Sequence, residues 1–187
     1  LGLLPDFFQA KRQPALWPLR PDALRTPATR FAAWPETAAT RYTKDLAALA
    51  GLRLHYWDSL TKDAEDTRGP TLVCLHDGQT WSQDFAHFFT QHSRDARVLV
   101  PDLPGFGRSD KPKKWQKIDA KNWWLQVVCE WLHAVAPKAL QAGQVQWVVT
   151  DANHPLLPAL KLALPPQRPH LCSLPPAHDQ RRQDAPY

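Results

Sequence analysis

Three short apolar runs, each followed by a polar turn, constrain the fold of this 187-residue chain more than any other feature. They occupy residues 71–75, 98–100 and 145–149. Predominantly apolar runs of this length are typical of central strands in a parallel sheet that is covered on both faces. The sequence therefore predicts an α/β fold. In such folds ligands bind at the carboxyl ends of the strands, so the turns after these runs are the candidate site.

Helix-like segments alternate with these runs, as the α/β prediction requires. Residues 84–92 and 156–164 can form short helices, and residues 119–135 carry an apolar stripe at helical spacing after a capping Asp119. Upstream, residues 52–57 alternate in polarity, which indicates an early antiparallel strand of a mixed sheet.

Prolines divide the chain into three regions. The sequence contains 19 prolines, which crowd toward its two ends. Because proline lacks an amide donor and is unfavourable inside helices, these ends are poor material for a packed core. We expect a proline-rich N-terminal extension at residues 1–40, a partial α/β domain at 41–165 and a disordered tail at 166–187.

Composition restricts the classes of partner. The net charge is +5, and the densest basic stretch reads as a solvated loop and helix start, so we expect no nucleic-acid partner. No run approaches the roughly 18 apolar residues that a membrane span needs. Cys74 and Cys129 fall in predicted buried elements, as reduced thiols do, which indicates a cytoplasmic location. The dispersed cysteines and histidines show no zinc-ligand spacing.

Two glycines follow the second apolar run, at Gly105 and Gly107. No third glycine completes a dinucleotide fingerprint, so we interpret them as a structural turn with positive φ. Ser109 and Asp110 are then expected to stabilise this turn.

Five segments, taken together and in order, resemble the N-terminal half of the α/β-hydrolases, and within that superfamily the haloalkane dehalogenases. They are RTPATRF (25–31), GLRLHYWDS (51–59), TLVCLHDGQTWS (71–82), RVLVPDLPGFGRSDKP (97–112) and VVTD (148–151). The resemblance implies an α/β-hydrolase-like, mostly parallel, doubly wound sheet. It also implies hydrolysis of a carbon–halogen bond in a small apolar haloalkane, with no cofactor and no metal. Epoxide hydrolysis, which uses the same aspartate chemistry, is the enzymatic alternative.

The resemblance also implies roles for particular residues. Asp151 takes the position of the nucleophile, which forms an alkyl-enzyme ester. The backbone amides of Gly78 and Ala152 take the positions of the oxyanion donors. Two structural alternatives stay open: Asp151 as the N-cap of the following helix, and His76 as a buried hydrogen-bonding histidine in an ordinary turn.

The sequence departs from the family pattern around Asp151. Ala152 stands where dehalogenases place a tryptophan, and Asn153 and His154 stand where two glycines are usual. Asp77 replaces a glycine beside the oxyanion turn. Only 36 residues follow Asp151, too few for the acid, the histidine and the cap, so we expect a C-terminally incomplete fold. The alternative function is therefore a non-catalytic hydrolase-fold remnant. We also expect residues 145–149 to form an open sheet edge that invites self-association.

Overall fold

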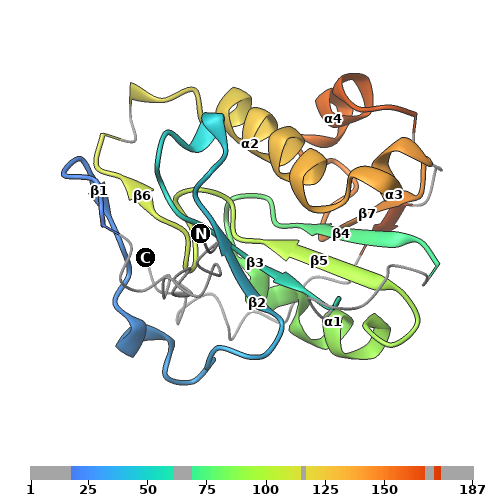
Figure 1. Cartoon of the computed structure of the whole chain (residues 1–187), viewed down its shortest axis with the longest axis horizontal. Helices are drawn as coiled ribbons and strands as arrows, with labels where there is room; N and C mark the ends of the chain where they lie inside the picture. The colour runs from blue at the N-terminus through green and yellow to red at the C-terminus, as the bar shows by residue number, and fades with distance from the viewer. Residues whose placement is uncertain (1–17, 61–68, 115–116, 167–170, 174–187) are drawn as a thin grey trace, which may run out of the picture.

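A six-stranded mixed sheet forms the centre of the protein, in the strand order β2-β3-β5-β4-β7-β8 (Figure 1). The computed structural model describes residues 18–60, 69–114, 117–166 and 171–173. The strands are β2 (Thr40–Thr43), β3 (Leu54–Asp58), β4 (Thr71–Leu75), β5 (Arg97–Pro101), β7 (Val145–Val149) and β8 (Leu171–Ser173).

The three apolar runs form neighbouring parallel strands, which confirms the central fold prediction. β4 lies between β5 and β7, and Val73 pairs with Leu99 on one side and Trp147 on the other. The expected early strand is β3, which runs antiparallel to β5, and β2 pairs antiparallel with β3. The sheet is therefore parallel at its centre and antiparallel at the β2 end.

Helices cover both faces of this sheet, as the doubly wound prediction requires. Figure 1 shows α1 on one side and α2, α3 and α4 on the other. The helical elements are η2 (Ala28–Phe31), η3 (Ala47–Leu49), η4 (Ser82–Phe85), α1 (Ala86–His92), α2 (Ala120–Val135), α3 (Pro137–Gln141) and α4 (Leu157–Ala163). Asp119 caps α2 by accepting a hydrogen bond from the Asn122 N–H at 3.2 Å.

The core has two layers because successive strand residues face opposite sides of the sheet. Val73, Leu99 and Trp147 point toward the α2 and α4 side and pack with fully buried residues such as Trp131. The intervening residues on the same strands, including Cys74, point toward the η4–α1 side and pack on Phe85. These two apolar layers fix the orientation of each strand, and therefore the position of the turn that follows it.

The two ends of the chain add elements that sequence patterns did not show. Within the expected N-terminal extension, β1 (Ala23–Leu24) pairs with β6 (Lys111–Pro112) in a separate two-stranded sheet. Within the expected tail, β8 pairs in parallel with β7, so β7 has a neighbour on each side. The expectation that β7 is an open edge is therefore wrong. The rest of the tail, apart from residue 166, lies outside the described residues.

Candidate active site

The turn after β5 is organised around the buried carboxylate of Asp102. Its oxygens accept hydrogen bonds from the Ser82 N–H at 2.8 Å and the Arg108 N–H at 2.8 Å, and lie 2.7 Å from Nδ1 of His55. Burial alone would raise the pKa of Asp102, but the His55 ring and the Arg108 N–H hold it well below its usual range. This carboxylate therefore joins three separate segments of chain.

Gly107 makes this arrangement possible. Its φ is +47°, and a Cβ there would lie 2.2 Å from Oδ2 of Asp102. Only glycine fits both constraints, which confirms the structural reading of the glycine pair. The expected turn-stabilising roles are also confirmed. Asp110 forms an ion pair with Arg25 at 2.7 Å, and the Ser109 hydroxyl donates to the Asp102 carbonyl at 2.6 Å.

The turn after β4 contains His76 in a fully buried position. Its Nε2 accepts a hydrogen bond from the Leu103 N–H at 2.8 Å. Burial lowers the pKa of His76 to about 4, so the ring is neutral near pH 7. A neutral ring that accepts at Nε2 carries its proton on Nδ1. The reading of His76 as a buried hydrogen-bonding histidine is thus confirmed.

Gly78 lies in the same turn with φ of +88°. Its amide nitrogen is 3.4 Å from Nδ1 of His76. The Gly78 N–H is therefore directed at the His76 ring within the turn. The Asp77 carboxylate accepts from the Gln79 N–H at 2.9 Å, so it takes part in its own turn.

The turn after β7 presents Asp151 to solvent. Its Oδ1 accepts from the Asn153 N–H at 2.8 Å, and its carbonyl accepts from the His154 N–H at 3.0 Å. The N-cap of α4 is Leu156, with no side-chain cap, so the reading of Asp151 as a helix N-cap is wrong. Among the described non-glycine residues a positive φ occurs at Ala50 alone, so Asp151 lacks the strained backbone typical of a nucleophile elbow.

The turns after β4 and β7 lie at the same end of these two parallel strands, as predicted. Nε2 of His154 is 2.9 Å from the carbonyl oxygen of His76. Ala152 is exposed beside Asp151. The structure therefore brings the Asp151 turn into contact with the turn that carries Gly78. Sequence reasoning missed both this bond and the His55–Asp102 pair, because neither involves residues that are close in the chain.

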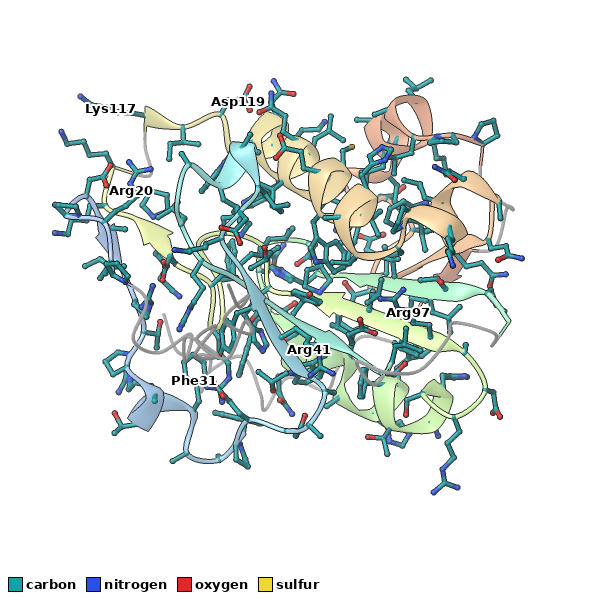
Figure 2. All side chains as sticks on the ribbon, viewed as in Figure 1. Arg20, Phe31, Arg41, Arg97, Lys117 and Asp119 are labelled. Atoms are coloured by element: carbon teal, nitrogen blue, oxygen red, sulfur yellow. The ribbon has the colours of Figure 1, made fainter. Side chains whose placement is uncertain are left out.

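A concave region lies away from these turns. It is a groove of about 490 Å³ between η3 and the start of α2, lined in part by Arg20, Lys117 and Asp119 (Figure 2). Arg20 is ion-paired with Asp22 at 2.5 Å, and Asp119 caps α2, so much of the polar rim is engaged internally. The groove shares no lining residue with the three turns described above.

The described residues contain no group of three or more His, Cys, Asp or Glu side chains placed to hold a metal ion. None of their helices has the length and hydrophobicity needed to cross a membrane.

Comparison with known proteins supports the resemblance read from the sequence. No family model matches the chain. It is 41% identical over 95 residues to a haloalkane dehalogenase of Mycolicibacterium paratuberculosis, a match that covers 49% of this chain and 30% of the relative. A haloalkane dehalogenase of Psychrobacter cryohalolentis is 38% identical over 92 residues, or 48% of this chain and 29% of the relative. The matched region thus spans about a third of these curated relatives.

Solved structures agree at the level of the fold. The tetrameric haloalkane dehalogenase DpaA from Paraglaciecola agarilytica matches with a TM-score of 0.59 and 28% identity, over 75% of this chain and 44% of that one. The Cif epoxide hydrolase from Acinetobacter nosocomialis matches with a TM-score of 0.52 and 17% identity, over 71% and 37% of the two chains. The sheet order, the helical layers and these similarities together assign the chain to the α/β-hydrolase superfamily, with a sequence similar over about half its length to haloalkane dehalogenases.

Proposed function

We propose that this chain provides the nucleophile turn and the oxyanion turn of a haloalkane-dehalogenase-type hydrolase. An oxygen of the Asp151 carboxylate attacks the carbon that carries the halogen. A C–O bond forms as the carbon–halogen bond breaks, and the halide ion leaves with the bonding electron pair. Water then attacks the carbonyl of the resulting ester, which releases an alcohol and restores the carboxylate. The substrate class is a small apolar haloalkane.

One observation carries this proposal. An exposed carboxylate follows the central strand β7, and its turn is hydrogen bonded to the turn that holds Gly78. This arrangement supports attack from Asp151 with the Gly78 amide nearby, and the Ala152 amide is the second proposed donor. Two such N–H donors stabilise the negative oxygen that develops when water attacks the ester.

Within the described residues, both steps of the reaction lack a side chain that would assist them. Within the described residues the Asp151 carboxylate accepts from the Asn153 N–H, and no side chain is hydrogen bonded to it. Ala152 offers no side-chain donor to a departing halide. Loss of one preorganised donor typically costs about 10²–10³ in rate, and loss of a general base about 10²–10⁴. We therefore expect this chain by itself to form the ester slowly and to hydrolyse it more slowly still.

A non-catalytic hydrolase-fold protein is the second candidate. The backbone of Asp151, which lacks the positive φ of an elbow, favours this alternative. Epoxide hydrolysis is a further enzymatic alternative, for which the similarity to an epoxide hydrolase at 17% identity supports the fold alone. An epoxide opened by Asp151 would give an ester without halide release, so the two chemistries are distinguishable.

Intact-protein mass spectrometry with 1-bromobutane, combined with bromide measurement, tests the proposal. We expect one butyl adduct per chain and one equivalent of bromide, both absent in Asp151→Asn. Asp95→Asn is the matched control. Asp95 is an exposed carboxylate in the turn before β5, so it lies at the opposite end of the parallel strands from Asp151. Absence of any adduct that depends on Asp151 would favour the non-catalytic alternative. Sustained bromide release over many turnovers would show that a base is present after all.

A further inference from the structure

His154 occupies an unusual position for a turn residue, since its side chain is only 2% exposed. Both ring nitrogens are hydrogen bonded. Nδ1 accepts from the Leu156 N–H at 3.2 Å, and Nε2 lies 2.9 Å from the carbonyl oxygen of His76. Because Nδ1 accepts, the ring is neutral and carries its proton on Nε2, which then donates to His76.

The ring therefore spans the space between two turns that carry different proposed functions. The Asp151 turn is a unit of its own, held by the hydrogen bonds from the Asn153 and His154 amides. The His76 carbonyl lies two residues before Gly78 in the other turn. The His154 side chain thus links the two units beyond the β4–β7 pairing, which ends at Leu75 and Val149. In the family that the sequence resembles a glycine is usual at this position, whereas here an imidazole ring links the two turns.

We propose that His154 is a positioning residue, which fixes the turn that carries Asp151 against the turn that carries Gly78 through its hydrogen bond to the His76 carbonyl. This inference deepens the proposed function and rests on it for its catalytic meaning. The geometry on which it depends is nevertheless measurable without any reaction.

Protonation of His154 is incompatible with this arrangement. A second ring proton would sit on Nδ1 and face the Leu156 N–H, so two donors would oppose each other. The charged or titratable groups that act on this ring are Asp77, Asp151 and the neutral His76, which itself feels Asp102. Burial lowers the pKa of His154, although the His76 carbonyl and both carboxylates favour the charged form. The contact between the turns should therefore loosen in acid.

Nuclear magnetic resonance of the full chain tests this inference with three variants. His154→Leu removes both hydrogen bonds at similar volume, His154→Gln keeps an N–H that can reach the His76 carbonyl, and His133→Leu is the control on an exposed face of α2. We expect His154→Leu to shift the His76 carbonyl carbon and the Asp77 and Gly78 amides. Exchange of the Leu156 amide should become about fivefold to tenfold faster, as expected for one lost hydrogen bond. The Gln variant should restore the wild-type His76 signal, and His133→Leu should leave it unchanged.

A pH titration of the wild type supplies a second measurement, in which a purely structural role would not couple the His76 and Gly78 signals to the His154 ring. The His76 carbonyl and Gly78 amide signals should titrate together with the His154 ring, and this transition should vanish in the Gln variant. If the His154→Leu signals at residues 76–78 match the wild type, or if Gln fails to restore them, the inference is wrong. If the Leu variant does not fold, the Gln variant and the wild-type titration still decide.

The changes in the His76 signals are measured without any reaction. If no ester forms at Asp151 in any variant, the proposed function fails while the signals of His76 still decide the positioning role. If the ester forms, its rate should fall about tenfold in His154→Leu and recover in His154→Gln, as expected when one positioning hydrogen bond is lost. An unchanged rate of ester formation in the Leu variant would overturn the positioning role even if the signals shift.

Discussion

The turn after β5 and the turn after β7 each contain an aspartate, and the two carboxylates are held very differently. Asp102 is completely buried and has three hydrogen-bond partners from three segments of chain. Asp151 is exposed and accepts one hydrogen bond, from an amide two residues away. A buried carboxylate with saturated oxygens stabilises the fold but cannot attack a substrate. An exposed carboxylate with free lone pairs contributes little stability and is available for chemistry.

The largest expected effect comes from Asp102→Asn. An amide offers one acceptor oxygen, so its NH₂ group would face a backbone donor, and the His55 ring would lose its charged partner. Breaking a buried pair of this kind typically costs about 3–5 kcal/mol in the free energy of unfolding. Urea unfolding of the variant and the wild type measures this cost. A change below about 1 kcal/mol would mean that Asp102 does not hold the three segments together.

Gly107→Ala should have a somewhat smaller effect on the same turn. A methyl group at φ of +47° is strained, and it would lie 2.2 Å from the Asp102 carboxylate. Strain of about 1–2 kcal/mol and overpacking of about 1–3 kcal/mol give an expected loss of about 2–5 kcal/mol. Gly51→Ala is the matched control, since φ there is also positive but an added Cβ would lie 4.0 Å from the Arg20 side chain. If both variants lose the same stability, the contact with Asp102 contributes nothing.

Acid should weaken the histidine contacts around the β4 turn. The pKa of buried His76 falls from 6.5 to about 4, so the unfolded chain takes up a proton at higher pH than the folded one. The contribution of His76 to the free energy of unfolding is therefore fully present above pH 6.5. It is lost as pH falls toward 4, by up to about 3 kcal/mol. The lowered pKa of His154 acts in the same direction. Unfolding at pH 7, 5.5 and 4.5 measures the loss, and His76→Gln should flatten the profile. Constant stability across this range would contradict neutral buried histidines.

The smallest effect on stability is expected for Asp151→Asn. Surface substitutions away from buried networks usually change stability by less than about 0.5 kcal/mol. The same substitution should abolish ester formation, so stability and reactivity separate at this residue. Thermal unfolding beside the labelling experiment measures both. A loss of several kcal/mol would place Asp151 among the fold-stabilising residues and erase its contrast with Asp102.

Local patterns in the sequence were enough for the fold but not for the contacts between turns. The apolar runs predicted β4, β5 and β7, and Asp119 predicted the start of α2, because each signal lies within a few neighbouring residues. The strand β8 was missed because three residues in a proline-rich stretch show no periodicity. Its pairing with β7 depends on tertiary contact.

The candidate site shows the same division. Asp151, Gly78 and Ala152 were predicted as site residues from the resemblance of their motifs to the dehalogenases, and their roles stay predictions. The His55–Asp102 pair joins residues 47 apart in sequence, and His154 reaches a carbonyl 78 residues away. A bulky histidine in place of a glycine looked like a departure from the pattern, and only the structure shows what its ring contacts. Such side-chain links follow from packing and leave no periodic signal in the sequence.

The central claim is that Asp151 is the reactive carboxylate of this fold. Peptide mapping by mass spectrometry, after incubation of the folded chain with 1-bromobutane, tests it most directly by locating the ester. The account predicts a butyl group on Asp151, and none on buried Asp102 or on exposed Asp95. An ester spread over several exposed carboxylates, or none on Asp151, would contradict it.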